Sequence, residues 1–229
     1  MIFITGDTHG YFATRLYQLD HYCPGINDTL VILGDVGINY NRNESDYALK
    51  QELAKEEITF FCIHGNHEER PVHIPTYRKI RYRGGIAWQE KEFPNLIFAK
   101  DGEIYDFSGK KTLVIGGAYS ADRDFRKKCG WAWFPDEQPT AEIRAYVEQQ
   151  LDAVNWKVDV VFSHTVPRKY EPVEIYPSSF DQSTLDHTTE DWLDLIEDRL
   201  DYKEWYAGHF HIEKVVGKLR IMYQDVHIL

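Results

Sequence analysis

Short apolar runs alternate with helical repeats of apolar residues in the first part of the chain. Three runs have the length of buried strands, namely Ile2 to Ile4, Leu30 to Leu33 and Ile58 to Ile63. Between them lie two segments whose apolar residues fall on one helical face: Phe12, Leu16 and Leu19 in the first, and Leu49 and Leu53 in the second, which begins near Ser45. Strand, helix, strand, helix, strand is typical of a parallel α/β sheet.

The middle of the chain has a different pattern. Glu103 to Phe107 and Thr112 to Ile115, joined by Ser108-Gly109-Lys110, are predicted to form a β-hairpin. The piece from Gly116 to Pro139 is rich in aromatic residues and is predicted to be irregular. The region from Arg70 to Asn95 is broken by three prolines and by Gly84-Gly85. We expect it to be a loop-rich insertion near the functional site.

Helices and strands alternate again in the second half. A helix is predicted from about Thr140, and a buried strand from Val158 to Phe162. Thr188-Thr189-Glu190-Asp191 matches a capping box and is expected to open a helix bearing Trp192, Ile196 and Leu200. Three strands are predicted in the tail: Glu204 to Tyr206, Lys214 to Val216 and Leu219 to Tyr223. Two facing sheets with helices outside accommodate these pieces, within a single domain over residues 1–229.

Composition limits the classes of partner. The 229 residues are 43% hydrophobic and 14% aromatic, which supports a substantial core, and the net charge is −11. This acidity makes nucleic acid a poor partner, because phosphate backbones need a concentrated basic surface. The basic run at Arg78, Lys79, Arg81 and Arg83 is explained more simply as a solvated strand or loop. No apolar stretch approaches the roughly 20 residues of a membrane span, and no signal peptide is apparent. A cytoplasmic protein is expected.

Good metal ligands follow five strand-like segments. They occur in Gly6-Asp7-Thr8-His9, Gly34-Asp35, Gly65-Asn66-His67, Ser163-His164 and Gly208-His209-Phe210-His211. The carboxyl ends of strands in an open α/β sheet meet at one edge, where ligands bind. Carboxylate, amide and imidazole groups without thiolates suit first-row divalent ions. A pair of such ions about 3.5–4 Å apart can clamp a phosphoryl group. Asp35 is then the candidate for the bridging carboxylate, and His67 could protonate the leaving oxygen.

Each segment taken alone has a simpler explanation. An isolated Asp-x-His after a strand is more often a helix cap or a satisfied surface pair than a metal site. Gly-Asn-His alone is ordinary turn chemistry, because Gly and Asn readily adopt positive φ. The joint occurrence of all five segments, each at a strand end, favours the metal site. Five of the ten histidines lie in these segments, and we expect the others to be surface or packing residues.

The complete set of motifs resembles the calcineurin-like metallophosphoesterase superfamily over nearly the whole chain. The resemblance implies an α/β fold, a four-layer α/β/β/α sandwich of two mixed sheets flanked by helices, with a dinuclear metal site at the C-terminal ends of strands. It implies that one metal is held by Asp7, His9, Asp35 and His211, and the other by Asp35, Asn66, His164 and His209. It also implies that His67 is catalytic and that a metal-bridging hydroxide attacks phosphorus in line.

Departures from the phosphoprotein phosphatase branch bear on the substrate. That branch carries Gly-Asp-x-Val-Asp-Arg-Gly and an Arg before Gly-Asn-His-Glu, whereas here Asp35 is followed by Val36-Gly37-Ile38-Asn39-Tyr40, and His64 precedes Gly65. Two phosphate-binding arginines are therefore absent from their expected places. Asn39, Tyr119 and Arg123 are candidates to line the substrate pocket instead, although a plain surface role for Arg123 is equally compatible with its position.

The sequence therefore predicts a metal-dependent hydrolase of phosphomonoesters or phosphodiesters. Two divalent ions are expected as cofactors, with Mn the first expectation and Fe, Zn or Ni as alternatives. A small phosphorylated substrate or a nucleotide is the expected partner, a phosphoprotein is a further candidate, and neither a membrane nor nucleic acid is expected. Two alternatives remain: a serine/threonine phosphatase like the phosphoprotein phosphatases, and a non-catalytic scaffold. A scaffold should have lost ligands or His67, and this chain retains them.

Overall fold

The first six strands of the chain and β13 near its C-terminal end form a seven-stranded mixed sheet. The computed structural model describes residues 1–179 and 181–229. The strands lie in the order β13-β1-β2-β3-β6-β5-β4, and β1, β2, β3 and β6 are mutually parallel. Their bounds are β1 Ile2–Thr5, β2 Thr29–Ile32, β3 Thr59–Cys62, β4 Tyr77–Tyr82, β5 Gly85–Glu90, β6 Leu96–Ala99 and β13 His227–Ile228. The apolar runs predicted as strands form β1, β2 and β3, which are buried throughout except at Thr59, where β3 begins.

A six-stranded mixed sheet contains the remaining strands in the order β11-β12-β10-β9-β8-β7. Its centre is parallel, because β8, β9, β10 and β12 run in the same direction. The bounds are β7 Ile104–Phe107, β8 Lys110–Ile115, β9 Val160–Ser163, β10 Glu204–Ala207, β11 Lys214–Val216 and β12 Leu219–Ile221. The predicted hairpin and the three predicted tail strands are confirmed as β7–β8, β10, β11 and β12.

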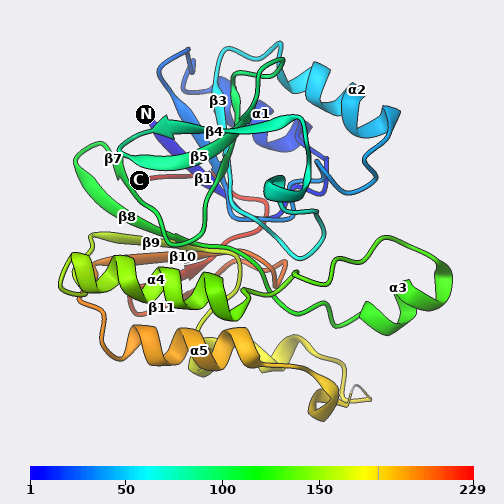
Figure 1. Ribbon diagram of the computed structural model, residues 1–229, viewed down its shortest axis with the longest axis vertical. Coiled ribbons are helices and arrows are strands. Elements are labelled where there is room, and N and C mark those ends of the chain that lie inside the picture. The colour runs from blue at the N-terminus through cyan, green and yellow to red at the C-terminus, as the bar shows by residue number, and fades with distance from the viewer. Residues whose placement is uncertain (180) are drawn as a thin grey trace.

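Helices cover the outer face of each sheet, and the sheets face one another (Figure 1). The helices are α1 Ala13–Asp20, α2 Glu44–Leu53, α3 Arg123–Cys129, α4 Ala141–Ala153 and α5 Thr188–Glu197. Phe61 and Phe162 belong to the apolar cluster between the sheets. Leu19 and Leu53 pack on the first sheet, and Val147 and Ile196 are in the cluster on the second. The α/β/β/α sandwich of two mixed sheets is therefore confirmed.

The prediction for residues 70–95 is wrong. This region contains β4 and β5, an antiparallel hairpin in which Tyr77 pairs with Glu90 and Tyr82 with Gly85. The prolines that suggested a loop lie outside the two strands, and Gly84 occupies the turn at φ 88°. The basic residues predicted on a solvated strand or loop are on or next to β4, the edge strand, where Arg78, Lys79 and Arg81 are exposed.

Two further predictions need correction. The aromatic piece 116–139 is not wholly irregular, because it contains α3, which lies at the right of Figure 1, outside the layers of the other helices. The capping box at Thr188 is absent. Helix α5 begins at Thr188, and the preceding carboxylate of Asp186 accepts the Thr188 N–H at 3.0 Å. No helix in the described part of the chain has the length and apolar character needed to cross a bilayer.

Candidate metal centre

The predicted ligands follow the carboxyl ends of parallel strands from both sheets. Asp7 follows β1, Asp35 follows β2, Asn66 follows β3, His164 follows β9, and the His-x-His motif follows β10. Four of these residues have left-handed backbones, with φ of 45° at His9, 48° at Asp35, 69° at His209 and 53° at His211. Such conformations are costly for non-glycine residues and concentrate at functional sites. The tight turns direct the side chains back across the strand ends.

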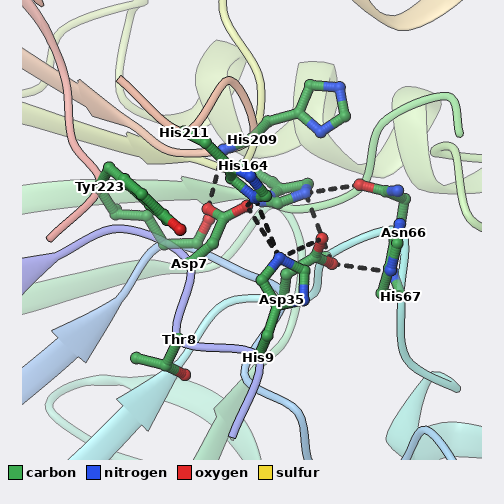
Figure 2. Close-up of polar contacts among 12 residues, drawn as sticks. Asp7, Thr8, His9, Asp35, Asn66, His67, His164, His209, His211 and Tyr223 are labelled. Carbon is green, nitrogen blue, oxygen red and sulfur yellow. Dashed lines mark hydrogen bonds and ion pairs between the residues drawn. The ribbon is translucent and has the colours of Figure 1, made fainter. Parts of the chain in front are cut away.

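Asp7, His9 and His211 form the first group of donors (Figure 2). The Nε2 atom of His211 lies 3.1 Å from Asp7 Oδ2 and 3.0 Å from His9 Nε2. The hydrogen bond to Asp7 raises the pKa of His211, and Tyr223 stacks on its ring at a centroid distance of 4.7 Å. The ligand atoms of all three residues lie within 4.8 Å of one another, close enough to share one ion.

Asp35 lies between the first group and the remaining histidines. Its Oδ2 is 3.8 Å from His9 Nε2, and its Oδ1 is 3.7 Å from His164 Nε2. Burial on its own would raise the pKa of Asp35, but the surrounding imidazoles of His164, His67 and His9 lower it overall, so the carboxylate is ionised. Asp35 belongs to one close donor group with His9 and His67, and to another with Asp7 and His164. This is the position that a bridging ligand requires.

The side chain of Asn66 is oriented by a buried hydrogen-bond chain. Its Nδ2 donates to Ser120 Oγ at 2.9 Å, and Ser120 Oγ donates to Glu137 at 2.6 Å. The amide oxygen therefore faces His164 Nε2 at 2.7 Å. Nδ1 of His164 lies 2.7 Å from the carbonyl oxygen of Leu33, the outer contact that commonly fixes a metal-binding imidazole. Oxygen and nitrogen donors, each held by a second contact, fit a hard or borderline divalent ion.

His209 contacts the cluster in two ways. Its backbone N–H donates to Asp7 Oδ1 at 2.8 Å, and its ring lies edge-on to that of His164 at a centroid distance of 5.0 Å. Burial lowers the pKa of His209 to about 3, so the imidazole is neutral. The His209 ring is not among the close donor groups of the described residues, and Figure 2 shows it to one side of the contacts drawn as dashed lines. Its assignment as a ligand stays a prediction.

His67 is held at both its backbone and its ring. Its N–H donates to Asp35 Oδ1 at 2.8 Å, and its ring Nδ1 lies 2.6 Å from a guanidinium nitrogen of Arg126. Burial and the charge of Arg126 lower the pKa of His67, against the opposing effect of Asp35. Sequence reasoning missed Arg126. It lies in a short charged segment with no apolar periodicity, and its contact with His67 spans 59 residues of sequence, so no local signal indicated it.

Two buried ionisable residues, Arg15 and Glu68, connect the loops that carry the ligands. Arg15 on α1 donates to the carbonyl oxygens of Asp7 at 2.6 Å and Tyr223 at 3.0 Å, joining the first and last loops of the site. Glu68 accepts the N–H groups of Gly65 at 2.7 Å and Val36 at 3.0 Å, joining the loops after β2 and β3. Burial raises the pKa of Glu68 well above its ordinary value.

Glycine is required where two of these loops touch. A Cβ on Gly34 would lie 2.1 Å from Nδ1 of His164, and one on Gly65 would lie 2.1 Å from Oδ1 of Asp35. Both distances are far below van der Waals contact. At these two positions the space is filled by another predicted ligand.

The three predicted substrate-binding residues lie in different surroundings. Asn39 is buried, and its amide pairs with the hydroxyl of Tyr77 at 3.1 Å, so its hydrogen bonds are used in the core. Tyr119 lines a small cavity with His209 and Phe210. The guanidinium of Arg123 lies over the Tyr119 ring, 5.2 Å from its centroid. Tyr119 and Arg123 therefore remain candidate contacts, and the assignment of the buried Asn39 to the substrate pocket also stays a prediction.

Comparison with known proteins agrees with this architecture. A four-layer sandwich with carboxylate, amide and imidazole groups gathered at its strand ends defines a class of metal-dependent phosphoester hydrolases. The chain belongs to the calcineurin-like phosphoesterase family, whose sequence pattern matches residues 1–213. No curated protein matches the chain significantly.

One solved structure shows a similar fold at low sequence identity. This crystal structure aligns with a TM-score of 0.50 and 15% identity over 96% of this chain and 88% of its own. The crystal structure of TT1561 of Thermus thermophilus aligns with a TM-score of 0.49 and 14% identity over 97% of this chain and 87% of its own.

Proposed function

We propose that this chain hydrolyses phosphate esters with a pair of divalent metal ions bound at the strand ends. The observation that carries the proposal is the convergence of two carboxylates, Asp7 and Asp35, with the rings of His9, His164 and His211 in overlapping close groups. Asp7, His9, Asp35 and His211 would hold one ion, and Asp35, Asn66, His164 and His209 the other. When bound, such ions neutralise phosphoryl charge and lower the pKa of water. We propose Mn as the first candidate, with Fe, Zn or Ni as alternatives.

Side chains of this protein would stabilise the leaving oxygen and bind the rest of the substrate during hydrolysis. The oxygen of a water molecule forms a bond to phosphorus, the ester P–O bond breaks, and the leaving oxygen must be stabilised. We assign the last task to His67, and the position of one of its ring nitrogens, within 4.8 Å of donor atoms of His9 and Asp35, supports this assignment. The Tyr119 ring and the Arg123 guanidinium would contact the remainder of a small phosphorylated substrate or a nucleotide.

Metal-dependent turnover of simple aryl esters tests the proposal. The protein is stripped of metal with a chelator, dialysed and loaded with Mn, and hydrolysis of 4-nitrophenyl phosphate and bis(4-nitrophenyl) phosphate is then measured. We expect no turnover without metal, turnover of at least one ester after loading, and about two bound ions per chain by elemental analysis. A fully folded, metal-loaded protein that hydrolyses neither ester would favour the scaffold alternative.

Histidine variants separate catalysis from metal binding. His67→Gln is expected to lower kcat by about a hundredfold or more, while the number of bound ions stays the same. His21→Gln is the matched control, because His21 is exposed at the end of α1 and its ring contacts Tyr17. Loss of bound metal in His67→Gln would make His67 a ligand, contrary to its proposed role.

A further inference from the structure

Arg126 reaches His67 from α3, a helix outside the four layers. Its side chain is only 4% exposed, and three of its nitrogens have partners. Nε donates to Asp122 Oδ2 at 3.0 Å, Nη1 donates to the carbonyl oxygen of Ala132 at 3.0 Å, and Nη2 lies 2.6 Å from Nδ1 of His67. Contacts within residues 122–132 thus fix the guanidinium, and its third nitrogen is presented to His67.

Tyr40 holds the same two groups from the side. Its ring stacks on that of His67, with 6.5 Å between centroids and 23° between planes, and the Arg126 guanidinium lies 5.3 Å from its centroid. Phe134 contacts the Tyr40 ring edge-on at 6.4 Å. The planar side chains of Tyr40 and Arg126, and that of Phe134 behind Tyr40, therefore restrict both the position and the rotation of the His67 imidazole. Tyr40, five positions after Asp35, thus supports His67 through stacking.

The chemistry of the contact determines which ring nitrogen carries the proton. A guanidinium has only N–H donors and no acceptor lone pair. Nδ1 of His67 must therefore accept the hydrogen bond with its own lone pair. The proton of the neutral ring is then on Nε2, which is a hydrogen-bond donor.

We propose that Arg126 is a positioning residue that fixes His67 in the tautomer with a protonated Nε2, so that this N–H is directed to the leaving oxygen. The proposal rests on the proposed function, in which His67 serves the leaving group. Arg126 therefore does not replace the missing phosphate-binding arginines, because its guanidinium acts on His67 and not on the phosphoryl group.

Kinetics with two leaving groups test this role in the Mn-loaded protein. Arg126→Met is expected to lower kcat by about tenfold to a hundredfold, with KM within about threefold of its original value, because positioning affects the transition state. The loss should be larger for phenyl phosphate than for 4-nitrophenyl phosphate, since the more basic leaving oxygen depends more on the His67 N–H. Arg126→Lys, which retains a cationic donor, should recover part of the loss.

Controls distinguish positioning from folding and from substrate binding. Lys128→Met removes an exposed charge from the same helix and should leave kcat unchanged. Adding Arg126→Met to His67→Gln should cause little further loss, because the two residues act as a unit. An equal loss for both leaving groups would indicate a structural role, and a raised KM with unchanged kcat would indicate direct phosphate binding. Either result overturns the proposal.

The tautomer of His67 can also be measured directly, without an activity assay. Long-range ¹H–¹⁵N spectra of the Zn-loaded protein, with His67 assigned through His67→Gln, report which ring nitrogen is protonated. We expect a protonated Nε2 and a bare Nδ1 in the unaltered chain, and mixed tautomers in Arg126→Met and Arg126→Lys in proportion to their lost kcat. A protonated Nδ1 would overturn the proposal even if the protein is active. An inactive protein with the expected tautomer would instead contradict the proposed function.

Discussion

Glu190, at the edge of the site, is an ionisable residue whose charged form the fold stabilises only in part. Glu190 on α5 is 3% exposed and accepts a hydrogen bond from Thr165 Oγ1 at 2.8 Å through one oxygen. Its other oxygen has no hydrogen-bond partner within the described residues. Burial raises the pKa of Glu190 to about 7. A group of this kind makes stability depend on pH near neutrality.

The direction of that dependence follows from proton binding. Above the ordinary value of 4.5, the unfolded chain ionises Glu190 while the folded chain keeps it protonated up to about 7. The folded state therefore binds more protons in this range, and the contribution of Glu190 to stability falls as the pH rises. Glu190→Gln removes the dependence. We expect the stability of the variant relative to the original chain to increase by about 1–3 kcal/mol between pH 5 and pH 8, measured by urea unfolding in one metal-containing buffer.

The matched control for this variant is Glu44→Gln, at an exposed glutamate in the first turn of α2. It should show no comparable change between the two pH values. A Glu190→Gln difference that stays constant or shrinks as the pH rises would contradict the assigned role of burial at this carboxyl group.

At the scale of elements, the site depends on close contact between the loops after β2 and β3. A methyl group on Gly65 would collide with the backbone nitrogen and Oδ1 of Asp35, each 2.1 Å away. Gly65→Ala should therefore displace Asp35, lower stability by about 1–3 kcal/mol and reduce the amount of bound metal. Thermal unfolding and elemental analysis measure the two effects.

Gly25→Ala is the control for this substitution, because a Cβ there would have no neighbour within 4 Å. It should retain both the stability and the metal content of the original chain. Full metal binding by Gly65→Ala would show that the two loops can separate without disturbing Asp35, against the expectation from their packing.

The sequence predicted those elements whose pattern is local. Continuous apolar runs identified β1, β2 and β3, and motif residues at their ends located most of the donor cluster. The β4–β5 hairpin was missed because its strands are partly exposed, so they contain no continuous apolar run, and because prolines flank them. Helix α3 was missed because its seven residues, Arg-Asp-Phe-Arg-Lys-Lys-Cys, present no apolar face. It is defined by charged contacts of Arg126, which a periodicity argument does not detect.

At the scale of the whole molecule, the site joins the two ends of the described chain. β1 pairs with β13, and Arg15 links the carbonyl groups of Asp7 and Tyr223. Arg15→Met removes both links and leaves buried carbonyl groups without these donors. We expect it to lower stability by about 1–3 kcal/mol and to weaken metal binding, because Tyr223 also stacks on His211. Calorimetric unfolding and metal titration measure these effects.

Arg78, on β4, provides the control for Arg15→Met. Arg78→Met makes the same chemical change on the exposed edge strand β4 and should leave metal affinity unaltered. If Arg15→Met lowers stability but binds metal normally, the link between the terminal loops supports the fold without organising the donor cluster.

The edge strand β4 has a further consequence for the molecule in concentrated solution. An edge strand presents unpaired backbone groups that can extend a sheet into a neighbouring copy. Arg78, Lys79 and Arg81 stand exposed along this edge, so an antiparallel pair of β4 strands from two copies would bring positive charges together. Repulsion at the edge opposes the growth of a continuous sheet between molecules. The basic residues of β4, for which the sequence indicated no ligand, thus oppose self-association of the protein through this edge strand.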